Sequence, residues 1–149
     1  MLSILIPGIR NYNWEAVYHS ARKATDVDFE MIFVGPTEPP EAIESSVKFI
    51  KDFGNPTRCA QIALLNSVGE YILWGSDDCL FVENSIDIGF KLLNALSPSH
   101  KNVISFVYTE GCCEYNIGHW YINLCGTSGS KYFPDSYCVV MNALIKRSY

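Results

Sequence analysis

Two neighbouring carboxylates, Asp77 and Asp78, directly follow the most apolar part of the sequence. The stretch is GEYILWGSDDCLF, residues 69–81, in which a glycine leads into large apolar side chains and the run stops at the two aspartates. Adjacent carboxylates repel each other and resist desolvation, so both stay ionised only where a cation or a donor-rich ligand lies close by. A hard divalent cation such as Mg²⁺ or Mn²⁺ takes carboxylate oxygens and usually shares itself with phosphates. The pair is therefore suited to holding a metal-bound diphosphate.

The same two aspartates have a local alternative, which is to form a turn and cap the next helix, as Asp commonly does. Taken alone, the triplet SDD favours this capping role. The position of the two aspartates in the chain supports the binding of a metal and phosphates. If the apolar residues before it form a strand of an open α/β sheet, the aspartates lie beyond the carboxyl end of that strand, where such sheets bind their ligands.

The rest of the chain alternates between apolar runs and amphipathic segments. The apolar runs are almost continuous, as expected for strands of a mostly parallel sheet whose two faces are both covered by helices. The expected strands are residues 2–6, 29–34, 47–50, 70–74 and 103–108. This pattern predicts an α/β fold of three layers, α/β/α, with a Rossmann-like arrangement.

Three amphipathic segments predict helices, the first of them over residues 14–24. Each follows an asparagine that can act as its cap, and these are Asn13, Asn55 and Asn84. The second helix has the clearest start, because Pro56 takes the first helical position, where its missing N–H costs nothing. It is expected to end near Val68. The third helix carries Asp87 at its third position, as in a capping box.

Length and composition limit the class of protein. A chain of 149 residues with 48% apolar and 18% charged residues predicts one globular domain. Its net charge of -5 argues against nucleic-acid binding, which needs a basic surface. The amino-terminal apolar run is short and meets Pro7, which predicts a first strand rather than a signal peptide or a transmembrane segment.

The cysteines favour a cytoplasmic location. They are scattered, form no C-x-x-C pair, and are therefore expected to be reduced thiols; they are Cys59, Cys79, Cys112, Cys113, Cys125 and Cys138. A metal cluster of some of these thiols with His119 is an alternative, but its spacing fits no common zinc pattern. Residues 109–136 mix glycine, serine and aromatic residues, which indicates a functional loop or an irregular hairpin. Residues 137–149 resume an apolar run and predict a strand that continues into a helix.

Three segments carry a resemblance to a known family. They are SILIP, FEMIFVG and, above all, TRCAQIALLNSVGEYILWGSDDCLF. Together they resemble the nucleotide-binding half of GT-A fold glycosyltransferases, specifically the inverting family 2, whose hallmark is a helix, Gly-Glu-Tyr-Ile, a strand and an acidic motif. The resemblance covers about residues 2–97. It implies one GT-A-like domain over residues 1–149, nucleotide-diphospho-sugar transferase-like, with the nucleotide-binding half at about 1–97 and a truncated acceptor-side region at about 109–149.

The resemblance also implies roles for individual residues. Asp78 matches the last carboxylate of the acidic motif and would bind the divalent metal, Mn²⁺ or Mg²⁺. Asp77 matches the middle position, which reaches the ribose of the nucleotide. Arg58 matches a basic residue that contacts the nucleotide, although from the residues alone it is equally a solvated surface side chain. Pro7 and Gly8 match the end of the first strand, which lies against the base, and would otherwise simply terminate that strand.

Two departures from the family pattern affect these expectations. Ser76 stands where the family usually has the first acidic residue, so the metal affinity should be lower. Gly35 follows the second strand where the family tends to have aspartates that read the base, so uridine is only a default. The catalytic base is unknown, because the acidic residues of the carboxyl-terminal part are more typical of loops; these are Glu110, Glu114 and Asp135. The aromatic side chains beside His119, which are Trp120 and Tyr121, either line a sugar pocket or pack in a core.

The resemblance implies an inverting, metal-dependent glycosyltransferase, hexosyltransferase-like, that moves a sugar from a nucleoside diphosphate sugar, UDP-sugar by default. The acceptor is an unknown glycan, lipid or protein, and the location is the cytoplasm, including the inner face of a membrane; a homo-oligomer is compatible. The alternative is a truncated or degenerate GT-A domain that binds a nucleotide or a partner without catalysis. A dinucleotide-binding oxidoreductase or a nucleotidyltransferase is disfavoured, because the sequence has neither G-x-G-x-x-G nor a phosphate loop ending in Lys-Ser/Thr.

Overall fold

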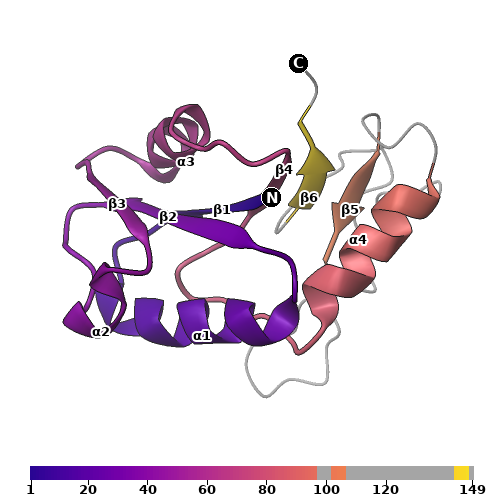
Figure 1. The fold of residues 1–149 in the computed structure, drawn as a ribbon. Coiled ribbons are helices and arrows are strands. Elements are labelled where there is room, and N and C mark those ends of the chain that lie inside the picture. Colours follow the sequence, from indigo (N-terminus) through magenta and orange to yellow (C-terminus); the bar gives the residue numbers. More distant parts are fainter. Residues whose placement is uncertain (97–101, 107–142, 148–149) are drawn as a thin grey trace, which may run out of the picture.

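A six-stranded mixed sheet forms the centre of the molecule in the computed structural model, which describes residues 1–96, 102–106 and 143–147 (Figure 1). The strands are β1 (Leu2–Pro7), β2 (Phe29–Gly35), β3 (Lys48–Lys51), β4 (Tyr71–Trp74), β5 (Val103–Ser105) and β6 (Ala143–Lys146). Their order across the sheet is β3-β2-β1-β4-β6-β5. The strands β1 to β4 run parallel, whereas β6 runs antiparallel to both of its neighbours.

Helices cover both faces of this sheet. They are α1 (Trp14–Ala24), preceded by the 3₁₀ turn η1 (Asn11–Asn13), α2 (Glu41–Glu44), α3 (Pro56–Leu65) and α4 (Ser85–Ala95). Figure 1 shows α3 on one side of the sheet and α1 on the other, with α4 beside the β5 end. The predicted three-layer α/β/α fold with a mostly parallel sheet is confirmed. None of the helices in the described part of the chain is long and apolar enough to cross a lipid bilayer.

The alternation of side chains along β1 divides the core into two layers. Leu2, Ile4 and Ile6 face α1 and α4, where they pack with residues such as Trp14, whereas Leu5 faces α3. Successive side chains of a strand point to opposite faces, so a strand that is apolar throughout can be buried on both sides. The strand β1 is therefore a central strand that is buried on both faces over residues 2–6, and both helical layers pack against it.

The order in which the chain adds strands reverses at β1, and we call this place the switch point of the sheet. The chain proceeds from β1 to β2 and β3 on one side, and then places β4 on the other side of β1. Because β1 to β4 are parallel, their carboxyl ends lie along one edge of the sheet. The segment that leaves β1 contacts the segment that leaves β4 at this edge, where the N–H groups of Ile9 and Arg10 donate to Asp77. Open α/β sheets usually bind their ligands in a crevice at this place, beyond the carboxyl ends of the strands and where the strand order reverses.

Most predicted elements are present, with shifted ends. Residues 14–24 form α1 as predicted, and β1 and β2 each extend one residue beyond the predicted strand. The second predicted helix ends at Leu65 and not near Val68, because the chain turns at Asn66. The last strand before the undescribed residues ends at Ser105 and not at residue 108. Residues 143–146 form the strand β6, in the later half of a segment for which the sequence predicts a strand that continues into a helix. The other residues of 137–149, apart from Arg147, and all of the candidate residues from Glu110 to Asp135 lie outside the described ranges.

The three predicted caps behave differently. The Asn55 side chain accepts a hydrogen bond from Arg58 N at 2.9 Å, which confirms this cap. Asn13 and Asn84 occupy the cap positions, but neither side chain makes a capping hydrogen bond. Asn84 has φ 59°, a left-handed conformation that asparagine tolerates. The predicted capping box is wrong for a physical reason, since Asp87 accepts from Thr25 Oγ1 at 2.6 Å and so links α4 to the end of α1.

Candidate functional site

Asp77 is buried at the switch point, just beyond β4. Its side chain is only 5% exposed. Its Oδ2 accepts hydrogen bonds from the backbone N–H groups of Ile9 and Arg10, both at 2.7 Å. Its Oδ1 accepts from Nη1 of Arg10, also at 2.7 Å. A buried carboxylate is tolerated when it is hydrogen-bonded and paired with a charge. Asp77 therefore holds the segment that leaves β1 against the segment that leaves β4.

Gly8 and Gly35 allow the backbone to pass closely at this edge. A Cβ on Gly8 would lie 2.9 Å from Asp77 Cβ and 2.9 Å from Trp14 Nε1. A Cβ on Gly35 would lie 1.9 Å from the carbonyl oxygen of Gly8, a contact that no side chain can make. The short distance between the ends of β1 and β2 therefore requires a glycine at both positions, directly after β1 and at the last residue of β2. Within the described residues, the buried Nε1 of Trp14 has no hydrogen-bond partner.

Arg10 bridges the two aspartates. Its Nη1 lies 2.7 Å from Asp77 Oδ1 and 2.8 Å from Asp78 Oδ2. Ser76 donates a hydrogen bond from its hydroxyl to the other carboxylate oxygen of Asp78. The carboxylates of Asp77 and then Asp78 raise the pKa of the Arg10 guanidinium, so it remains charged. The cation that the adjacent carboxylates require is therefore supplied in this structure by the chain itself.

Exposure distinguishes the members of this group. The Asp78 side chain is 49% exposed and the Arg10 side chain 39%, whereas the Asp77 side chain is almost completely buried. Solvent and ligands can therefore reach Asp78 and the outer side of the guanidinium, but not Asp77. In chemical terms, Asp77 is a fixed structural acceptor and Asp78 is the carboxylate that can exchange its partners.

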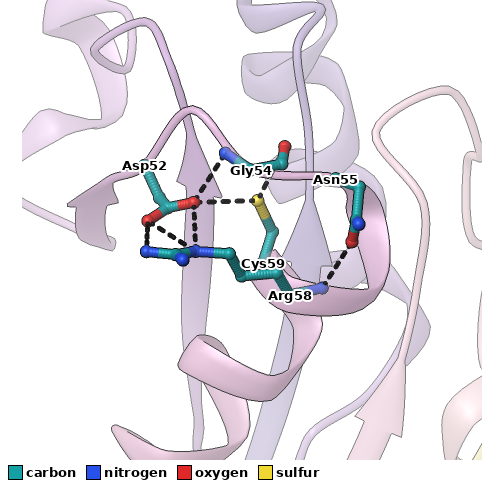
Figure 2. Close-up of polar contacts among 5 residues, drawn as sticks. All are labelled: Asp52, Gly54, Asn55, Arg58 and Cys59. Carbon is teal, nitrogen blue, oxygen red and sulfur yellow. Dashed lines mark hydrogen bonds and ion pairs between the residues drawn. The ribbon is translucent and has the colours of Figure 1, made fainter.

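Arg58 lies in a second polar cluster, at the start of α3 (Figure 2). Its Nε and Nη2 donate to the carboxylate of Asp52 at 3.0 to 3.2 Å. Asp52 follows β3, at the carboxyl edge of the sheet, and also accepts from the N–H of Gly54 at 2.7 Å. The Cys59 thiol lies 3.7 Å from the carbonyl oxygen of Gly54, and its burial raises its pKa. The guanidinium of Arg58 is therefore already paired and held in place.

The Asp52 carboxylate should make stability pH-dependent. The hydrogen bonds from Arg58 and then Gly54 hold the pKa of Asp52 below its usual value. A depressed pKa in the folded state contributes stability above the pKa of the unfolded state, and this contribution is lost as the pH falls through the folded value. We expect Asp52→Asn to be less stable than the wild type at pH 7, and the difference to shrink as the pH falls through the pKa of the Asp52 carboxyl in the folded state. Urea unfolding of both proteins from pH 7 to pH 2.5 measures this, and a difference independent of pH would contradict it.

The structure brings together four of the five predicted site residues. Pro7, Gly8 and the two aspartates meet at the carboxyl ends of β1 and β4. Arg58 is separate from them, because its guanidinium contacts Asp52 and not the acidic pair in the described residues. Arg10 and Asp52 were not predicted. Their only sequence signal is position, since each follows a strand that ends at the same edge as β4.

A divalent cation would have few protein ligands at this site. The described residues contain no group of three or more His, Cys, Asp or Glu side chains that could hold a metal. Asp77 is buried and both of its oxygens accept hydrogen bonds, which leaves the exposed carboxylate of Asp78, whose oxygens accept from Arg10 and Ser76. Mg²⁺ is commonly held by one or two carboxylates together with substrate phosphates and water. The residues thus fit a metal that is shared with a phosphate ligand, but not a cation held by the protein alone.

The fold of this chain is glycosyltransferase-like. The structure is similar to the crystal structure of residues 1–349 of S. aureus TarS, a glycosyltransferase, with a TM-score of 0.65 and 14% sequence identity over 97% of this chain. A second crystal structure of S. aureus TarS matches 76% of this chain with a TM-score of 0.57 and 16% identity. The chain spans 46% and 23% of the lengths of these two chains.

These similarities establish the fold, and the sequence adds no family assignment of its own. No family model matches the chain. No curated protein matches it either. The predicted glycosyltransferase-like architecture is therefore confirmed at the level of the fold.

Proposed function

We propose that this chain is the donor-binding part of a glycosyltransferase that acts on a nucleoside diphosphate sugar. The observation that carries the proposal is the acidic pair at the switch point of a glycosyltransferase-like sheet, with Asp78 exposed at the rim and Asp77 buried beneath it. An exposed carboxylate at this position, next to the closely packed backbone at Gly8, suits a ligand that carries both phosphates and a flat base.

The residues at the rim, that is, at the carboxyl edge of the sheet, would each bind a different part of the ligand. Asp78, with Ser76 beside it, would hold Mn²⁺ or Mg²⁺. A metal held there would offset the negative charge of the diphosphate leaving group. Asp77 would act on the ribose through the backbone at Ile9, which it fixes. Pro7 and Gly8 would form the floor beneath the base.

Arg58 would contact the nucleotide from the other end of the rim. The two-pronged contact with Asp52 fixes the plane of its guanidinium, so less side-chain freedom is lost when a ligand binds. Its position at the amino end of α3 adds the favourable field of the helix for an anion. The base is uridine by default, and the sugar and the acceptor are left open.

Thermal unfolding with Mn²⁺ and UDP tests the proposal. A ligand that binds only the folded state raises the free energy of unfolding, by about 2.7 kcal/mol at a ligand concentration 100 times Kd. The melting temperature rises with it. We expect the wild type to gain stability with Mn²⁺ and UDP together, and Asp78→Ala to lose this gain. Asp28→Ala is the matched control, because this exposed aspartate precedes β2 at the opposite edge of the sheet. Equal gains in the wild type and Asp78→Ala, or no gain in either, would contradict the proposal.

A second candidate is a GT-A-like domain that binds the nucleotide without catalysis. It is favoured by Ser76, which stands where the family has a charged ligand of the metal, and by Arg10, which already pairs with both carboxylates. Release of UDP from a UDP-sugar in the presence of Mn²⁺ separates the two candidates. Binding without any release of UDP above the rate in buffer favours the second.

A further inference from the structure

The nitrogen Nη1 of Arg10 occupies the position that a cation shared by the acidic pair would take. It lies within 2.8 Å of one oxygen from each aspartate. This arrangement is not an incidental surface contact. The backbone N–H of the same residue donates to the buried Asp77 at 2.7 Å, so the residue is fixed by both its main chain and its side chain. The loop that follows β1 therefore positions the guanidinium of Arg10 beside Asp78.

A divalent cation and this guanidinium cannot both hold Asp78 in the same way. The two are like charges, and at a separation of about 4 Å even bulk water leaves an appreciable repulsion between them. One oxygen of Asp78 accepts from Arg10 and the other from Ser76. Asp78 is half exposed, so its partner can be exchanged from solvent, whereas Asp77 is buried and keeps its partners.

We propose that Arg10 is a built-in cation that competes with a divalent metal for Asp78, so that the metal binds only when the guanidinium leaves this carboxylate. The inference rests on the proposed function, because it concerns the metal that would accompany the diphosphate. It assigns to Arg10 a positioning and selectivity role: it weakens the binding of metal alone and makes metal uptake depend on a ligand whose phosphates can receive the displaced guanidinium. Phosphate is a suitable receiver, because arginine pairs with phosphate oxygens through two parallel hydrogen bonds.

Binding of Mn²⁺ alone, without nucleotide, tests this directly. The full chain is titrated with Mn²⁺, and free Mn²⁺ is followed by its electron paramagnetic resonance signal. We expect Arg10→Gln to bind Mn²⁺ about tenfold more tightly than the wild type, because a like charge beside the metal position has been removed. A merely structural role for Arg10 would lower the affinity or leave it unchanged. An Arg10→Gln affinity equal to or below that of the wild type overturns the proposal.

Matched variants assign the effect to this contact. Arg22→Gln removes the same charge from α1, where the guanidinium carbon lies 5.5 Å from the ring centroid of Phe29, and should bind Mn²⁺ as the wild type does. Arg10→Gln combined with Asp78→Asn should lose the gain. Retention of the gain in this double variant, or the same gain in Arg22→Gln, overturns the proposal.

If Arg10→Gln does not fold, Arg10→Lys still tests the proposal. Lysine retains the positive charge, so the proposal expects weak Mn²⁺ binding close to that of the wild type, and tight binding by Arg10→Lys overturns it. The result is separable from the proposed function. A wild type that binds UDP, with an Arg10→Gln variant that gains no Mn²⁺ affinity, overturns this inference alone. A tenfold gain in a chain that binds no UDP supports the competition at Asp78 and contradicts the nucleotide assignment.

Discussion

Replacing Gly35 by alanine is expected to lower the free energy of unfolding by about 3 kcal/mol or more. The added Cβ would lie 1.9 Å from the carbonyl oxygen of Gly8, and this neighbour is backbone that cannot rotate away. The ends of β1 and β2 would have to separate. Their separation would strain the hydrogen bond from Gly8 N to the Val34 oxygen and the one from Asp52 N to the Gly35 oxygen, each 3.0 Å long.

Equilibrium urea unfolding followed by circular dichroism measures this loss. Gly54→Ala is the matched control, because its new Cβ would meet Arg58 Cδ and Asp52 Oδ1, which are side-chain atoms and not backbone. We expect the control to lose at most about 1 kcal/mol. Similar losses in the two variants would mean that the close approach of the strand ends does not determine stability at this edge.

The second large effect is expected at Asp77. Asp77→Ala removes the acceptor of two backbone N–H groups and of the Arg10 guanidinium at a buried position, and should cost about 3 kcal/mol. Asp78→Ala should cost less than about 1 kcal/mol, because this side chain is 49% exposed and its pair with Arg10 is open to solvent. Neighbouring residues of the same type are therefore expected to differ several-fold in their effect on stability.

Thermal and urea unfolding of the two alanine variants, without metal or nucleotide, tests this difference. Asp77→Asn is a useful intermediate, since its amide oxygen can still accept one of the backbone hydrogen bonds while the ion pair with Arg10 is lost. Its loss should lie between those of Asp77→Ala and the wild type. If Asp78→Ala were the more damaging of the two alanine variants, the assignment of Asp77 as the fixed acceptor would be wrong.

The sequence predicts the parts of this structure that depend on local patterns. The continuous apolar runs predict β1 and β2 with the correct first residues and with carboxyl ends that differ from the structure by one residue. Asn55 followed by Pro56 located the start of α3, because the cap and the proline act within one turn. The acidic pair could be placed at the sheet edge for the same reason, since it directly follows the apolar residues of β4.

The partners of the site residues could not be predicted in this way. Arg10 and Asp77 are 67 residues apart, and their contact exists only because β1 and β4 are neighbours in the sheet. The sequence indicated that the acidic pair needs a cation but not that the chain supplies one. Similarly, Arg58 was assigned to the site from its motif, whereas its pairing with Asp52 depends on where β3 ends. Tertiary contacts of this kind leave no periodic signal in the sequence.

The position of β6 has a consequence for how the chain acquires its structure during synthesis. β6 lies between β4 and β5, yet the ribosome makes its residues after both of these neighbours. Until residues 143–146 emerge, the outer edge of β4 has open backbone donors and acceptors, which are a template for unwanted pairing with other chains. Fragments that end before Ala143 are therefore expected to aggregate, and a nascent chain would need a chaperone or rapid completion to avoid the same outcome.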